Sequence, residues 1–243
     1  MQSWGLTDPG CVRVQNQDTY KIEHLDRNTL LCVVCDGMGG AKSGNVASTL
    51  AMDVFVEEVR RVWNSGLEQD ETESMLQGAV KLANFTVFDQ AQQFEEFSGM
   101  GTTLVALVVR GKEATVVNVG DSRAYRVSKE GIHRITTDHS LVQLMVDRGE
   151  LPPERARTYP GKNYITRAIG TEPTVLCDIF HVEVDRGDCL LLCSDGLSNV
   201  MDDQEILFEV VHGFNKQYCC QRLLEIAKNR GAPDNVTSIL VQI

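Results

Sequence analysis

Four aspartates stand in short turn-like words that are far apart along this chain. Asp36 lies in DGMGG, Asp121 in GDSR, Asp195 in SDGL and Asp234 in PDNV. Apolar, β-branched or cysteine-rich runs precede three of them, namely LLCVVC, ATVVNVG and CLLLCS. Such runs predict buried strands, so we expect the carboxylates at strand ends that the fold brings together. Taken singly, Asp-Gly and Asp-Asn pairs are also common turn signals.

Carboxylates that gather at one place repel one another. They then take up protons, or a multivalent cation neutralises them. Oxygen ligands without histidine or cysteine are typical of Mg²⁺ or Mn²⁺ sites rather than zinc sites. The four aspartates therefore predict a site for Mn²⁺ or Mg²⁺.

The composition is that of one globular domain. The chain has 243 residues, 42% of them hydrophobic, and a formal net charge of -11. This acidity argues against a nucleic-acid partner or an anionic membrane surface. No basic segment followed by an apolar core opens the chain, and no apolar run reaches transmembrane length. We expect a cytoplasmic protein that is monomeric and has no membrane partner.

Eight cysteines invite a disulfide or zinc interpretation. Cys32 and Cys35 have CxxC spacing but lie in a strand-like run, where positions three apart point to opposite faces. Cys189 and Cys193 share a face of another strand-like run. The remaining cysteines lack partners at zinc-finger spacing. We expect reduced thiols, several of them in the core.

Apolar runs and helical periodicity alternate along the chain. Strands are predicted at Leu30 to Cys35, Thr102 to Val109, Ala114 to Val119, Ala124 to Val127, Leu176 to Val184, Cys189 to Cys193 and Ser238 to Val241. Helices are predicted at Ser43 to Trp63, Glu71 to Phe94, Asp203 to His212 and Lys216 to Asn229. Short loops at 110–112 and 120–122 predict antiparallel hairpins. We expect helices outside antiparallel sheets.

Two of these helices carry apolar side chains at helical spacing. The first has Val46, Leu50 and Val54 on one face, and the second has Met75, Ala79, Leu82 and Phe85 on related positions. These faces are predicted to pack on the sheets.

Eight words follow one another in the order of a known family. They are RVQNQD (13–18), DGMGG (36–40), GTT (101–103), GDSR (120–123), DHS (138–140), TRAIG (166–170), SDG (194–196) and DNVT (234–237). The chain thereby resembles the metal-dependent serine/threonine protein phosphatases, the PPM or type 2C family, in its compact bacterial form. The resemblance implies an α+β fold, a four-layer α-β-β-α sandwich of two antiparallel sheets flanked by helices. It also implies one domain over residues 1–243, with a flap at about 140–171 that gates the substrate.

The resemblance also implies roles for particular residues. Two Mn²⁺ or Mg²⁺ ions would share Asp36 and would take the Gly37 carbonyl, Asp195 and Asp234 as further ligands. Asp18 would hydrogen-bond metal-bound water.

Two further positions match the family's words. Arg13 would hold the phosphate, for which a guanidinium fork is well suited. Asp121 would help Asp195 to hold a weaker third ion, or would only brace the GDSR turn.

The implied reaction is hydrolysis of phosphoserine or phosphothreonine on proteins. A water that bridges the two ions would attack phosphorus directly, and phosphorylated proteins would be the substrates, opposite a cognate serine/threonine kinase. Two alternatives stay open: a binding module that has lost turnover, and a phosphatase dedicated to one regulatory protein.

Two positions depart from the family's words. Ala41 stands where bacterial members commonly carry histidine after DGMGG, and Tyr159 stands before Pro160 where relatives often have histidine. The proton donor to the leaving group would then be metal-bound water or another residue. His139 is a candidate, although a structural role for it is the stronger interpretation.

Overall fold

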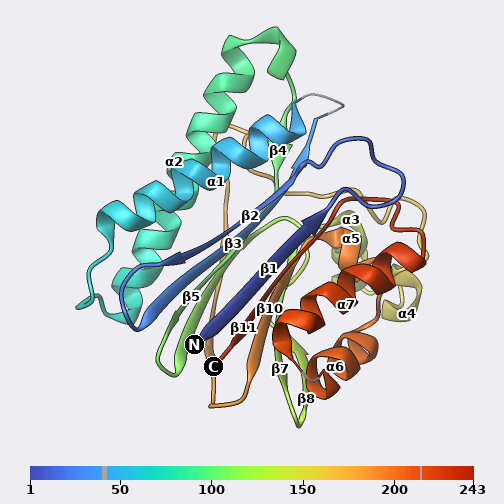
Figure 1. Cartoon of the computed structure of the whole chain (residues 1–243). Helices are drawn as coiled ribbons and strands as arrows, with labels where there is room; N and C mark the ends of the chain where they lie inside the picture. The colour runs from blue at the N-terminus through green and yellow to red at the C-terminus, as the bar shows by residue number, and fades with distance from the viewer. Residues whose placement is uncertain (40–42, 214) are drawn as a thin grey trace.

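The computed structural model describes residues 1–39, 43–213 and 215–243. Within these ranges the chain forms the predicted four-layer α-β-β-α sandwich (Figure 1). The strands are β1 (Gln2–Asp8), β2 (Asp18–His24), β3 (Thr29–Met38), β4 (Gly101–Thr102), β5 (Leu104–Arg110), β6 (Glu113–Val119), β7 (Arg123–Ser128), β8 (Gly131–Arg134), β9 (Asp178–Glu183), β10 (Cys189–Cys193) and β11 (Val236–Gln242). The helices are α1 (Gly44–Val62), α2 (Gln69–Gln93), the short 3-10 helix η1 (Glu95–Phe97), α3 (Leu141–Asp147), α4 (Pro153–Ala156), α5 (Asp195–Ser198), α6 (Asp203–His212) and α7 (Lys216–Asn229).

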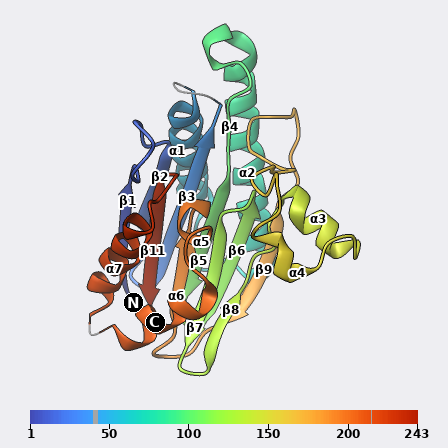
Figure 2. The same ribbon diagram turned by 90° about the vertical axis from the view of Figure 1, so that its right-hand side faces the viewer.

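The strands make two antiparallel sheets. The first has the order β1-β11-β10-β7-β8, and the second has the order β2-β3-β5-β6-β9 with β4 beside β3. Strands β1 and β11 pair from Gln2 opposite Gln242 to Asp8 opposite Val236, so the two chain ends lie together (Figure 1). Helices α1 and α2 cover the second sheet, and α5, α6 and α7 cover the first (Figure 2).

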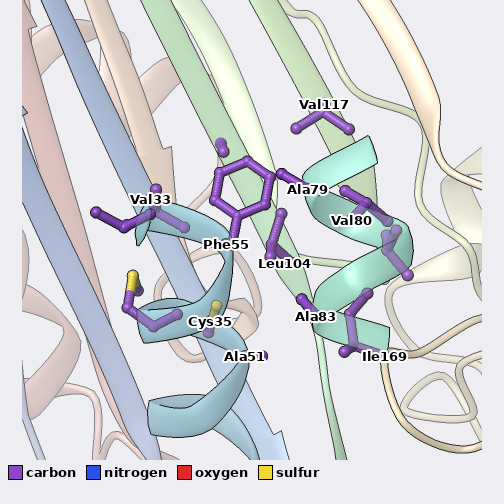
Figure 3. Close-up of a cluster of buried hydrophobic side chains, with 14 of the residues drawn as sticks. Val33, Cys35, Ala51, Phe55, Ala79, Val80, Ala83, Leu104, Val117 and Ile169 are labelled. Atoms are coloured by element: carbon purple, nitrogen blue, oxygen red, sulfur yellow. The ribbon is translucent and has the colours of Figure 1, made fainter. Parts of the chain in front are cut away.

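Three apolar cores separate the four layers. One lies between the second sheet and α1 and α2, where Phe55 packs near Leu104 and the alanines of α2 (Figure 3). Another lies between the sheets, and the third lies beneath α6 and α7. Because the strands in the middle of each sheet are covered on both faces, their sequences are continuous apolar runs.

The cysteines are free thiols, as predicted. Cys32 faces the core between the sheets, whereas Cys35 faces the core under α1. Cys189 and Cys193 share the core under α6 and α7. Among the described residues, no helix is both long enough and apolar enough to span a membrane.

The predicted helices are present, and Val46, Leu50 and Val54 of α1 pack half-buried against the core, but the predicted face of α2 needs correction. In α2, Leu82 and Phe85 are exposed. The buried stripe of α2 runs instead through Met75, Ala79, Ala83 and Val87, and that of α1 through Ala47, Ala51, Phe55 and Val59. Small alanines let the two helices approach each other and the sheet, so the larger side chains beside them lie at the margin.

One predicted hairpin is confirmed and the other is wrong. Strands β5 and β6 pair through the loop at 110–112. Strands β6 and β7 belong to different sheets, so residues 120–122 form a crossover between the sheets rather than a hairpin. This crossover carries Asp121 to the point where both sheets end.

The segment 140–171 contains α3, α4 and turns (Figure 2). One backbone bridge, between Ser140 and Ile165, joins two parts of the segment to each other. A second bridge, between Thr102 and Ile169, joins the segment to β4.

Candidate active site

A cavity of about 610 Å³ lies where the ends of both sheets meet. Six of the seven predicted site residues line it: Arg13, Asp36, Gly37, Asp121, Asp195 and Asp234. Asp18, the seventh, does not line the cavity; it is buried and stands opposite Asp36 in the register of β2 and β3. The fold therefore brings together the carboxylates that are far apart in sequence.

Close backbone approach brings these carboxylates together. Gly196 follows Asp195 at the start of α5, and a Cβ there would lie 1.8 Å from the Asn235 carbonyl oxygen. A Cβ on Gly37 would lie 2.0 Å from the Gly44 carbonyl oxygen. No side chain fits at either position, so glycine lets the Asp195 turn approach the Asp234 loop, and β3 approach the start of α1.

The GTT word braces Asp36. The Asp36 N–H donates to Thr103 Oγ1 at 3.0 Å, and Thr102 Oγ1 donates to the Asp36 carbonyl at 2.8 Å. Thr103 Oγ1 also lies 2.8 Å from Ser122 Oγ, next to Asp121. These hydroxyl groups connect the backbone that carries Asp36 with the crossover that carries Asp121.

Asn235 holds the loop that carries Arg13. Its Nδ2 donates to the carbonyls of Pro9 and Gln15, both at 3.0 Å, and its Oδ1 accepts from the Gln17 N–H at 2.8 Å. Both ends of the Arg13 loop are thereby fixed to the residue after Asp234. Arg13 Nη2 donates to Asp234 Oδ2 at 2.8 Å.

Asp18 is buried against two hydroxyl groups. Its Oδ2 accepts from Ser194 Oγ and from Thr237 Oγ1, both at 2.7 Å. Its Oδ1 has no hydrogen-bond partner among the described residues, and neither has Oδ1 of Asp195.

Burial and mutual repulsion disturb the ionisation of these carboxyl groups. Burial raises the pKa of Asp18 to about 7, and the charge of Asp195 adds to the effect. Burial, together with the charge of Asp195, raises the pKa of Asp121 to about 8. The pKa of Asp36 is raised by burial and by Asp18, and that of Asp195 by burial and by Asp234. A bound cation would reverse this repulsion.

Comparison with known proteins identifies a family with this arrangement. The family description "Protein phosphatase 2C" matches residues 13–232. The chain belongs to this family.

Relatives with curated names agree with this family assignment. The serine/threonine phosphatase stp of Listeria monocytogenes (serotype 4b) is 34% identical over 97% of this chain and 93% of its own length. The protein phosphatase PhpP of Streptococcus pneumoniae is 34% identical over 98% of this chain and 96% of its own. The crystal structure of a serine/threonine phosphatase from Staphylococcus aureus covers all of this chain and 94% of its own, with a TM-score of 0.93 and 38% identity. This chain is a protein-serine/threonine phosphatase.

The residues of this phosphatase fit divalent cations. The cavity offers hard oxygen donors, and its carboxylates repel one another. In addition, the buried Oδ1 of Asp195 has no hydrogen-bond partner among the described residues. In the described ranges, no group of three or more His, Cys, Asp or Glu side chains is already arranged to hold a metal ion. Asp234 is also occupied by Arg13. An ion at Asp234 would therefore replace this hydrogen bond.

His139 is buried in a network outside the cavity of the phosphatase. Its Nδ1 accepts from the Gly120 N–H at 3.1 Å, and its Nε2 lies 3.1 Å from Asp178 Oδ2. Arg167 Nη1 donates to Asp178 Oδ1 at 2.7 Å. This geometry supports the structural interpretation, in which His139 braces the Gly120–Asp121 turn. Ala41 lies outside the described residues.

The bracing roles of three residues were missed in the sequence. Asn235, Thr103 and Ser194 hold the segments that carry the aspartates and Arg13, yet none was assigned a role. Each lies inside one of the family's words, and Asn235 and Ser194 stand directly beside an aspartate, whereas Thr103 does not. A hydroxyl or amide side chain next to an aspartate is the signal that could have marked the first two.

Proposed function

We propose that this phosphatase hydrolyses phosphoserine and phosphothreonine on proteins with the help of Mn²⁺ or Mg²⁺. The observation that carries the proposal is the convergence of Asp36, Asp195, Asp234 and Arg13 on one cavity. A protein that had kept only the fold would not need this set of mutually repelling carboxylates beside an arginine.

Asp36, the Gly37 carbonyl, Asp195 and Asp234 would hold two core ions, and Asp121 with Asp195 would hold a weaker third. Bound ions would supply neutralising charge and would activate a water for direct attack on phosphorus. Asp18 would orient water next to Asp36, because its Oδ2 is fixed by two hydroxyl groups and its Oδ1 has no described partner.

Arg13 would bind the phosphate. Its side chain is 54% exposed, and it bonds to Asp234 through a single nitrogen. With Asp234 engaged by an ion instead, the Arg13 guanidinium would be free to donate two parallel hydrogen bonds to phosphate oxygens. Asn235 keeps the loop in place during this exchange.

The wider setting belongs to the same proposal. Substrates would be phosphorylated proteins of a cognate serine/threonine kinase, and the enzyme would be a cytoplasmic monomer. Residues 140–171 would form the flap, which is supported by Asn163 and Ile165 of this segment lining the cavity.

The test is phosphate release from phosphothreonine peptides with and without Mn²⁺. Asp36→Asn and Asp195→Asn should abolish Mn²⁺-dependent release while circular dichroism shows an intact fold. Asp185→Asn is the control, because Asp185 is exposed and bonds to Lys112 away from the cavity. A wild-type chain without turnover would support the binding-module alternative, and turnover of one phosphoprotein alone would support the dedicated phosphatase.

A further inference from the structure

Two valines beside Arg13 are exposed at the cavity mouth. Val14 is 97% exposed and Val12 is 67% exposed, and both line the cavity that contains Asp36 and Asp234. A single exposed valine needs no explanation. Two exposed valines that flank the proposed phosphate-binding arginine at a cavity mouth form a surface that an entering substrate would contact.

Two further apolar side chains line the same cavity. Met38 follows Asp36 on β3, and Ile165 comes from the segment 140–171, where its bridge to Ser140 fixes its backbone. Both are half-buried and line the same cavity. We call Val12, Val14, Met38 and Ile165 the apolar rim.

The charges near the rim disfavour acidic substrates. Among the described residues that line the cavity, Arg13 is the single cation, and four aspartates face it. Arg13 is committed to the phosphate in the proposed function. Among the described lining residues, an acidic side chain next to the phosphorylated residue would therefore meet no cation other than Arg13, and the whole chain carries a net charge of -11.

An aliphatic side chain next to the phosphorylated residue would bind favourably at the same place. Val12 and Val14 lie on either side of Arg13 in sequence, so the neighbours of a residue whose phosphate binds Arg13 lie within reach of the rim. Covering exposed valine with another apolar side chain removes both from water. The apolar rim thus adds favourable contacts with the substrate's side chains, separate from the contacts that bind the phosphate.

We propose that the apolar rim selects phosphorylated serines or threonines whose neighbouring residues are aliphatic rather than acidic. This inference rests on the proposed function and specifies its substrate class. The occupant is a side chain of the substrate protein adjacent to the phosphorylated residue. Val14 would be the main specificity-determining position, since it is the most exposed member of the rim.

The test uses three phosphothreonine peptides that differ only at the two residues flanking phosphothreonine, which are valine, serine or aspartate. For the wild type we expect kcat/KM to fall in that order, from the valine to the aspartate peptide, by roughly tenfold. The difference should lie mainly in KM, because the apolar contacts discriminate between the peptides only modestly. Val14→Ser should reduce the preference of valine over serine by about threefold. Val14→Lys should in addition raise kcat/KM for the aspartate peptide.

Leu176→Ser is the matched control, because Leu176 is 75% exposed and does not line the cavity. It should keep the wild-type order of the peptides. Equal kcat/KM for all three peptides, or an unchanged preference in both Val14→Ser and Val12→Ser, would overturn the inference. Failure of the proposed function is seen separately, as absence of Mn²⁺-dependent hydrolysis of p-nitrophenyl phosphate by the wild type.

Discussion

Replacing Asp18 with asparagine should stabilise the metal-free protein and weaken its hold on metal. Asp18 is buried, and its pKa is raised to about 7 from the usual 3.8. Ionising this carboxyl in the folded chain therefore costs on the order of 4 kcal/mol. Asparagine has the shape of the protonated carboxyl, and its carbonyl can still accept from Ser194 and Thr237.

The pH dependence follows from the direction of the shift. The unfolded chain releases this proton near pH 4, whereas the folded chain keeps it until about pH 7. Between these values the folded state binds more protons, so the free energy of unfolding falls as pH rises and levels off above pH 7. From pH 5.5 to 8 the stability of Asp18→Asn relative to the wild type should grow by about 2 kcal/mol.

The assay is thermal unfolding in the presence of a chelator at both pH values. For a domain of this size, a growth of about 2 kcal/mol corresponds to a relative rise in Tm of roughly 4 to 8 °C. With Mn²⁺ present the variant should lose this advantage, because the orienting carboxylate beside Asp36 is gone.

A matched control is Asp188→Asn. Asp188 is also buried, but it bonds to Arg126 at 2.7 Å, so its replacement should lower stability. A difference between Asp18→Asn and the wild type that does not change with pH, or a less stable variant at pH 8, would refute the reasoning.

Three further substitutions test separate parts of the site. Asp121→Ala should shift the Mn²⁺ titration of activity to higher concentration without abolishing turnover; an unchanged midpoint would contradict a role in the third site. Asn235→Ala removes three hydrogen bonds from the Arg13 loop, so it should cost about 3 kcal/mol in unfolding experiments and raise KM more than it lowers kcat. His139→Gln should lower Tm while keeping at least a tenth of the wild-type kcat at saturating Mn²⁺, since the network braces a turn; complete loss of turnover with an intact fold would instead support the catalytic alternative.

The central strands were predictable, and so was the edge strand β9, but three other edge strands were not. Helices α6 and α7 have the predicted limits, because Asp202 and Asn215 cap their first turns and mark where they begin. Strands β1, β2 and β8 were missed, and all three lie at the edges of their sheets. An edge strand is partly solvated, so its apolar pattern is weak. The crossover at 120–122 was read as a hairpin because a short loop does not show which sheet the next strand joins.

The acidic residues of the candidate site were predictable, but their supports were not. An aspartate at the end of an apolar run is a local pattern, visible without knowing the fold. Asn235 acts through carbonyls 220 and 226 residues away in sequence, and Thr103 acts through Asp36 on another strand. Such partners are decided by how the two sheets are packed together; a local pattern can mark a polar side chain beside an aspartate, but it does not show which segment that side chain holds.

The supports share one property that matters for metal affinity, which is that they are neutral. Thr103 and Asn235 hold backbone, and Ser194 and Thr237 bond to Asp18 through hydroxyl groups. Among the described residues, the one cation hydrogen-bonded to any of these aspartates is Arg13, which is largely exposed and can exchange its partner for phosphate. Neutral braces fix geometry without cancelling charge, so the repulsion that destabilises the metal-free fold would be retained until a divalent ion relieved it. Binding of an ion would then stabilise the folded state by mass action, and the same carboxylates that lower stability without metal would supply the affinity for it.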